Sequence, residues 1–83
     1  MWFVYILLCI DNSLYTGSTN NLEKRFLAHA SGKGGSYTRS HKPLKIIYSE
    51  KFKTHSEALK REIEIKSWER EVKIKTLNLI LAP

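Results

Sequence analysis

The sequence predicts a small α+β domain whose elements follow one another in the order β-β-α-β-α-α. Two strand-like segments near the N-terminus, a third near the middle and two capped stretches with helical spacing of apolar residues support this class. The chain has 83 residues, and a fold of this size hides only about 60% of the surface of its unfolded chain. We therefore expect a single domain over residues 1–83.

The chain begins with a predicted β-hairpin. Residues 2–9 are rich in β-branched and aromatic types, which favour a buried strand. Residues 11–13 have turn chemistry, and residues 14–17 form a short return strand.

The length of the turn decides where the two hairpin tyrosines lie. A three-residue loop over 11–13 would place Tyr15 opposite Cys9, and thus on the same face as Tyr5. A two-residue loop would place the tyrosines on opposite faces, and core tyrosines are common in hairpins.

The middle of the chain is predicted to contain a helix, a loop and a strand. Asn20 followed by Glu23 has the spacing of a helix N-cap, which predicts a helix over 21–31. Three glycines make 32–36 a loop, and the apolar residues of 44–52 predict the third strand.

The C-terminal part is predicted to be helical. Thr54 and Glu57 have the spacing of a capping box, which starts a helix over 55–68. Apolar residues at helical spacing, beginning at Val72, then predict a further helix that continues to Pro83.

Composition restricts the class of protein. The one cysteine, Cys9, lies in an apolar run, so we expect a buried inert thiol and no disulfide or zinc site. That run is too short to span a bilayer. These features predict a cytoplasmic protein with no membrane contact.

The charge indicates a polyanionic partner. The formal net charge is +6, and the segment from Lys24 to Lys53 holds eight Lys or Arg residues against one acid, Glu50. A basic stretch of this kind is the electrostatic signature of nucleic-acid binding.

Glu62 is the most unusual residue of the second capped helix. At about 100° per residue it falls within an apolar arc, whose other members are Ala58, Leu59, Ile63 and Ile65. A carboxylate in such a position has to be paired, protonated or bound to a metal. Lys66, one turn further on, offers a plain salt bridge at the favourable spacing, and periodicity cannot decide between these readings.

Arg25 and His29 are also one turn apart and flank the apolar positions of the first helix. Both could reach over the edge of the sheet, or they could form a partly solvated basic face.

Five features follow one another along the chain, namely Val4-Tyr5-Ile6, Tyr15-Thr16-Gly17, Arg25, His29 and the stretch from Glu57 to Lys66. In this order they resemble the motifs of the GIY-YIG nuclease superfamily, especially of its short, stand-alone, mostly bacterial members. Val4 stands where the superfamily has glycine, and Thr16 stands where it has isoleucine. The resemblance implies a small three-stranded, mainly antiparallel sheet flanked by helices. Its implied site is one concave face that gathers Tyr5, Tyr15, Arg25, His29 and Glu62.

The resemblance also implies an activity, namely a metal-dependent endonuclease that hydrolyses phosphodiester bonds in nucleic acid. DNA is the expected substrate by analogy, with repair or recombination as the expected setting. Glu62 would hold one Mg²⁺ or Mn²⁺ ion, and Arg25 would clamp the scissile phosphate. Tyr5 or Tyr15 would take the proton of the attacking water, and His29 could instead relay it.

Substrate binding is expected to rely on the basic stretch. The predicted nucleic-acid contacts are Lys24, Lys33, Tyr37, Arg39 and Lys42. Tyr37 either stacks on a base or is an ordinary surface tyrosine. Selectivity would come from nucleic-acid shape or from a partner protein. Two alternatives are a nucleic-acid-binding module without catalysis and a protein-interaction domain.

Overall fold

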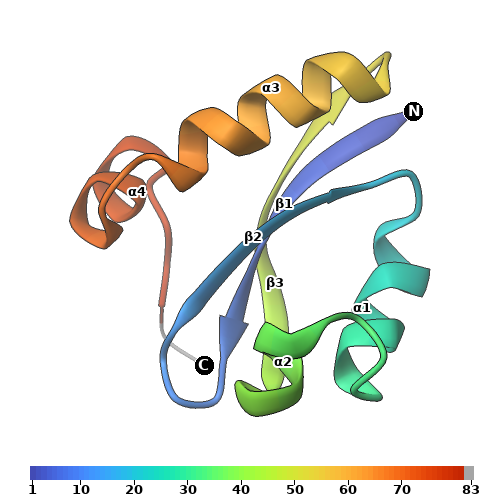
Figure 1. Cartoon of the computed structure of the whole chain (residues 1–83). Helices are drawn as coiled ribbons and strands as arrows, with labels where there is room; N and C mark the ends of the chain where they lie inside the picture. Colours follow the sequence, from blue (N-terminus) through green and yellow to red (C-terminus); the bar gives the residue numbers. More distant parts are fainter. Residues whose placement is uncertain (82–83) are drawn as a thin grey trace.

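The computed structural model describes residues 1–81 and confirms the α+β class with a three-stranded antiparallel sheet (Figure 1). Its strands are β1 (Trp2–Cys9), β2 (Leu14–Thr19) and β3 (Pro43–Phe52). Its helices are α1 (Leu22–Ala30), α2 (Ser36–Ser40), α3 (His55–Lys66) and α4 (Arg70–Thr76).

β1 is the central strand, in the order β2-β1-β3, and both neighbours run antiparallel to it. The apolar run that predicted this strand is buried from Val4 to Cys9, as expected for a strand covered on both faces. The thiol of Cys9 is buried, as predicted.

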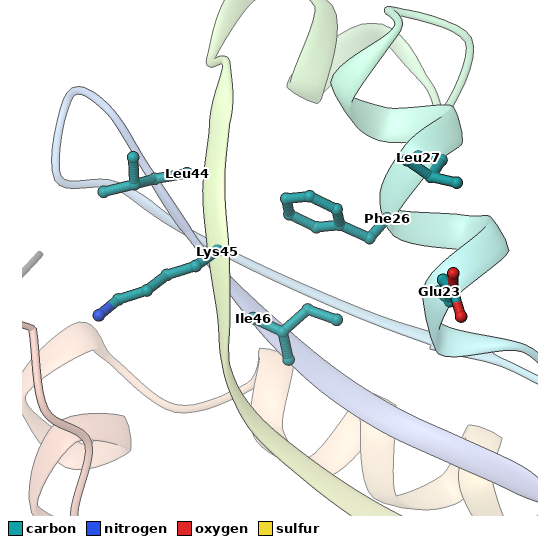
Figure 2. A pocket seen from close by; sticks show the side chains of 6 residues that line it. All are labelled: Glu23, Phe26, Leu27, Leu44, Lys45 and Ile46. Carbon is teal, nitrogen blue, oxygen red and sulfur yellow. The ribbon is translucent and has the colours of Figure 1, made fainter.

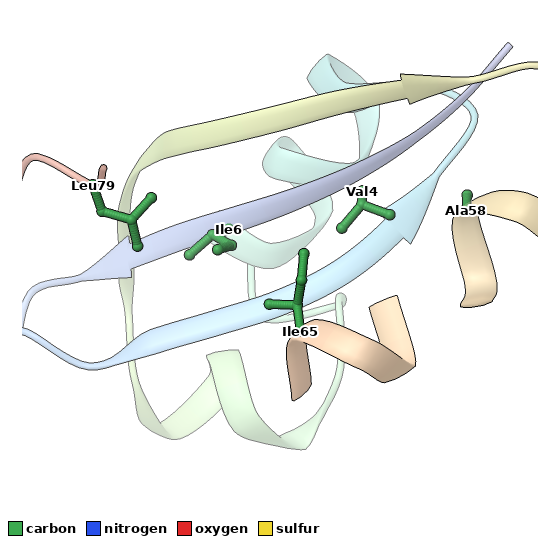
Figure 3. Close-up of a cluster of buried hydrophobic side chains, with 5 residues drawn as sticks. All are labelled: Val4, Ile6, Ala58, Ile65 and Leu79. Atoms are coloured by element: carbon green, nitrogen blue, oxygen red, sulfur yellow. The ribbon is translucent and has the colours of Figure 1, made fainter. Parts of the chain in front are cut away.

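Successive side chains of a strand point to opposite sides of the sheet, so each face presents its own set of residues. Different elements cover the two faces. One face packs against α3 and the C-terminal segment in an apolar core (Figure 3). The fully or almost fully buried members of this core are Val4, Ile6, Ala58, Ile65 and Leu79. The opposite face, to which Tyr5 points, is covered by α1 and α2 (Figure 1).

Thr16 lies opposite Ile6 and therefore on the α3 face. Its side chain is 3% exposed, and its Oγ1 has no hydrogen-bond partner among the described residues. An unpaired buried hydroxyl costs about 1–3 kcal/mol. Within residues 1–81, the α3 face thus contains one buried hydroxyl without a hydrogen-bond partner.

The helix starts were predicted well for α3 and one residue early for α1. Thr54 and Glu57 form both bonds of the expected capping box. The N-cap of α1 is Asn21, whose side chain accepts from the backbone N–H of Lys24, so the prediction of Asn20 was wrong. Consecutive asparagines offer the same side chain at both positions, and the sequence does not distinguish them.

The predicted helix ends were too late. α3 ends at Lys66 rather than residue 68, and α4 ends at Thr76, where the sequence predicted helix as far as Pro83. Asn78, with φ 53°, takes the left-handed conformation soon after α4 ends. Leu79 instead fills the core from an irregular segment, and Pro83 lies outside the described residues.

The predicted apolar arc of α3 is also narrower than expected. Ala58 and Ile65 are fully buried, but Leu59 is 43% exposed and Ile63 is 61% exposed. The helix therefore contacts the sheet along one narrow stripe, and Glu62 lies at the border of this stripe.

The predicted hairpin register was wrong by two residues, although the predicted face is right. Tyr15 pairs with Leu7 rather than Cys9, because the turn is longer than three residues and places Asn12 at φ 70°. A shift of two residues preserves the face of every side chain. β2 also continues to Thr19, two residues beyond the predicted end.

Candidate active site

Four of the predicted site residues meet on the face covered by α1 and α2, and Tyr5 and His29 are in direct contact. The Tyr5 hydroxyl lies 2.9 Å from Nε2 of His29, and both side chains are almost fully buried. Nδ1 of His29 lies 2.7 Å from Oγ1 of Thr38 on α2. Three polar side chains from three elements thus form one buried hydrogen-bonded chain.

Arg25 completes the surroundings of the Tyr5 hydroxyl. Its guanidinium charge acts directly on that hydroxyl. Burial raises the pKa of Tyr5 to about 12, although the nearby Arg25 charge acts in the opposite direction. Burial, and to a lesser degree Arg25, lower the pKa of His29. At neutral pH the phenol is therefore protonated and the imidazole is uncharged.

Two glycines permit this packing. A Cβ at position 17 would lie 2.5 Å from the Tyr5 hydroxyl, and a Cβ at position 34 would lie 2.2 Å from Nδ1 of His29. The Gly34 carbonyl also accepts a hydrogen bond of 3.0 Å from Nη2 of Arg25. The glycine-rich loop therefore holds two site residues in place.

Tyr15 lies beside this chain in an aromatic cluster. Its ring centroid is 6.4 Å from that of Tyr5 and 5.0 Å from that of His29, which it meets edge-on. Tyr37 stacks on Tyr15 at 5.5 Å and on His41 at 4.2 Å. The ring predicted to stack on a base is thus already stacked within the protein.

Glu62 approaches the site from the other face of the sheet, so the five residues do not converge on one face as implied. Its Oε1 accepts a 2.6 Å hydrogen bond from Ser18, which alternates to the α3 side of β2. Its Oε2 lies 2.7 Å from Nζ of Lys66, which confirms the salt bridge that the spacing allowed. Because β2 is an outer strand, Lys66 also reaches within 6.0 Å of the Tyr15 ring centroid.

The residues around Glu62 fit a weakly held metal ion better than a preformed metal centre. Within residues 1–81 no three His, Cys, Asp or Glu side chains gather closely enough to ligate a metal. Mg²⁺ nevertheless binds through one or two carboxylates completed by water and phosphate. The Lys66 ammonium already places a positive charge against Glu62, and the Lys66 side chain is half-exposed.

Two cavities adjoin α1. One, of about 310 Å³, is mainly apolar and lies between α1 and β3, where Phe26 points from the helix toward the strand (Figure 2). It shares no residue with the site. The other, of about 240 Å³, is more polar and reaches the site through Arg25. Its lining residues are Thr19, Asn20, Asn21, Lys24, Arg25 and Ala28.

The predicted nucleic-acid contacts lie on accessible surface. The four basic residues in this set are exposed, namely Lys24, Lys33, Arg39 and Lys42. Lys24 borders the polar cavity beside Arg25. Their role in binding stays a prediction.

Several residues that build the site were not among the predicted site residues. Thr38, Gly34 and Ser18 each contact a predicted site residue directly. Thr38 lies on α2, a five-residue helix that begins at the end of the predicted loop and for which no element was predicted. Because α2 buries only one side chain, it has no apolar periodicity by which it could have been predicted.

A buried tyrosine and histidine and a partly exposed arginine beside one sheet, with a carboxylate at its edge, define a candidate hydrolase site on a small α+β scaffold. Residues 1–78 match the family described as the GIY-YIG catalytic domain, and the chain belongs to that family.

Short bacterial relatives support this assignment over nearly the whole chain. A UPF0213 protein of Staphylococcus haemolyticus is 48% identical over 76 residues, which cover 92% of this chain and 93% of the relative. A UPF0213 protein of Clostridium perfringens is 50% identical, with 94% and 84% covered. The solution NMR structure of the UPF0213 protein BH0048 from Bacillus halodurans is 39% identical, with a TM-score of 0.60 over 94% of this chain and 84% of that one.

The two departures from the family motifs lie away from the tyrosines. Val4 is fully buried in the core beneath α3, and Thr16 lies on the same face, whereas Tyr5 and Tyr15 point to the other face. None of the helices within residues 1–81 is long and apolar enough to cross a membrane.

Proposed function

We propose that this protein is a metal-dependent endonuclease that hydrolyses phosphodiester bonds in DNA. The hydrogen bond between the Tyr5 hydroxyl and the buried, uncharged His29 is the observation that carries the proposal. A buried base that accepts from a phenol can receive a proton passed through that phenol. Salt bridges and apolar contacts alone would explain a stable fold but not this chain of polar groups.

The pKa of Tyr5, raised to about 12, favours a relay over a resting phenolate. Tyr5 takes a proton from the attacking water while its own proton passes to Nε2 of His29. The resulting hydroxide attacks phosphorus. The bond to the leaving oxygen breaks, and that oxygen departs with the electron pair and takes a proton from solvent. Tyr15, beside both rings, orients the water.

Arg25 and Glu62 supply the remaining functions. The guanidinium of Arg25 can donate two parallel hydrogen bonds to the non-bridging phosphate oxygens. Glu62 would hold one Mg²⁺ or Mn²⁺, which stabilises negative charge on the phosphate and the leaving group. Lys66, the present partner of Glu62, would then turn to a neighbouring phosphate.

Backbone contacts to DNA would come from the exposed basic residues around the polar cavity and the glycine-rich loop. Such contacts make binding sensitive to salt and largely indifferent to sequence. Selectivity would then depend on DNA shape or on a partner protein, in a setting such as repair or recombination.

Cleavage of duplex, single-stranded and branched DNA in Mg²⁺ and in Mn²⁺ tests the proposal. The wild type should cut at least one substrate, and Glu62→Gln and Arg25→Ala should remove cutting. Binding, followed by fluorescence anisotropy, should persist in Glu62→Gln. Glu64→Ala is the matched control, because Glu64 lies on the same helix, is half-exposed and pairs with Arg61.

Salt-sensitive binding by the wild type without cutting of any substrate in either metal would support the binding-module alternative instead. Absence of both binding and cutting would leave the protein-interaction alternative.

A further inference from the structure

The buried hydroxyl of Thr38 is not used by the reaction just described. Thr38 is 2% exposed, and its Oγ1 lies 2.7 Å from Nδ1 of His29. It is the only buried residue of α2. Among the described residues, Thr38 is the one whose side chain is hydrogen bonded to Nδ1 of His29.

The direction of each hydrogen bond in the chain follows from the groups that can only donate. A guanidinium has no acceptor atom, so Arg25, whose charge acts on the Tyr5 hydroxyl, can only donate to the Tyr5 oxygen. The Tyr5 proton then has Nε2 of His29, 2.9 Å away, as its acceptor when Nε2 is unprotonated. A neutral imidazole carries one proton, which therefore resides on Nδ1 and is donated to Thr38.

We propose that Thr38 is a positioning residue that holds His29 in the tautomer protonated at Nδ1, with Nε2 free to take the proton of Tyr5. A hydrogen bond at one imidazole nitrogen sets the state of the other. The reverse tautomer would point an N–H at the phenol and could not accept from it. The catalytic consequence rests on the proposed nuclease activity, whereas the tautomer is a property of the free protein.

The other groups around His29 do not replace Thr38. Arg25, on the same helix, is a donor only. Tyr15 meets the ring edge-on through its own aromatic ring. Gly34 lies against the imidazole, but its carbonyl accepts from Arg25.

Imidazole ¹⁵N NMR combined with single-turnover cleavage tests this proposal. The full chain is compared with Thr38→Val, which removes the hydroxyl at nearly constant volume, and with Thr38→Ser, which retains it. Thr16→Val is the matched control, because Thr16 is equally buried but its hydroxyl has no partner among the described residues. The His29 signals are assigned with a His29→Gln variant, since the chain has three histidines.

In the wild type, Nδ1 of His29 should show the shift of a protonated nitrogen and Nε2 that of an unprotonated one. In Thr38→Val this preference should be lost, and the cleavage rate constant should fall roughly 10- to 100-fold, as for other residues that orient a functional histidine. KM should not change. Thr38→Ser should restore both readouts, and Thr16→Val should alter neither.

A wild-type His29 protonated at Nε2 would overturn the proposal by itself, even if Thr38→Val did not fold. Unchanged His29 signals in a folded Thr38→Val would overturn it too, as would unchanged cleavage. If the wild type cuts no substrate, the nuclease proposal fails, and the ¹⁵N spectra still decide whether Thr38 sets the tautomer.

Discussion

The two faces of the sheet are both covered by helices, but different interactions hold the coverings in place. Under α3 the contacts are apolar and fully buried, between residues such as Ile6 and Ile65. Under α1 and α2, buried apolar side chains such as Leu7 lie beside a polar chain in which Tyr5, His29 and Thr38 are linked by hydrogen bonds. The same strand β1 supplies both faces.

This difference suggests a division of tasks between the two faces. Apolar burial is non-directional and tolerates change at the cost of stability. In a buried polar chain every group needs a hydrogen-bond partner, so the loss of one group disrupts the chain. We therefore expect substitutions under α3 to affect folding and substitutions under α1 to affect chemistry.

The largest expected effect is the loss of cleavage on substitution of Tyr5, on the polar face of the sheet. Tyr5→Phe removes one oxygen and should lower the single-turnover cleavage rate roughly 10²- to 10⁴-fold, as for loss of a general base. Its free energy of unfolding should fall by about 1–3 kcal/mol, because Nε2 of the buried His29 loses its partner. Urea unfolding and cleavage assays measure the two. A Tyr5→Phe protein that cuts at the wild-type rate would assign the relay to another residue.

The apolar face should give the opposite pattern. Ile65→Ala should lower the free energy of unfolding by about 2–5 kcal/mol, because it leaves a cavity beneath α3. Cleavage below the melting temperature should stay within a few-fold of the wild type. Ile65→Val, expected to cost about 0.5–1.5 kcal/mol, provides a milder variant. A large loss of cleavage in a folded variant would show that the faces are coupled.

Two glycines of one loop give a finer comparison. Gly34→Ala inserts a Cβ against His29 and should reduce both cleavage and stability, the latter by about 1–3 kcal/mol. Gly32 has φ 82° but open space around it, so Gly32→Ala should cost about 1–2 kcal/mol of backbone strain and leave cleavage unchanged. Similar cleavage by the two variants would contradict a role for Gly34 in positioning His29.

The smallest expected effect concerns pH. The folded pKa of His29 is lowered, so below about pH 6.5 the unfolded state binds a proton that the folded state does not. Stability should therefore fall as the pH decreases from 7.5 to 5.5, and His29→Gln should lack this contribution. Asp11, whose pKa Ser13 and His41 hold well below its usual range, contributes only at lower pH. Equal pH dependence in urea unfolding of both proteins would exclude His29 as the source.

Much of the fold was predictable because its signals are local. The apolar run of β1 and the capping box of α3 each specify structure through neighbouring residues, and both were correct. The hairpin register depended on the turn around Asn12, which strand propensity does not encode. α2 was missed because its one buried side chain is polar.

The site was less predictable, because its contacts join distant segments. Tyr5 and His29 are 24 positions apart, and Ser18 and Glu62 are 44 positions apart. Periodicity describes one element at a time and could indicate only that Glu62 was unusual. The family resemblance named the residues, and the fold then showed that Glu62 reaches the sheet edge from the opposite face.

The position of β2 at the edge of the sheet gives the ion pair of Glu62 and Lys66 a second role. As an outer strand of the described sheet, β2 has one row of backbone groups without a neighbouring strand. Charged side chains beside such an edge hinder the addition of a strand from another molecule. Glu62 and Lys66 lie along this edge, near Ser18 and Tyr15. The pair should thus also limit self-association, and a double variant without either charge is expected to aggregate more readily.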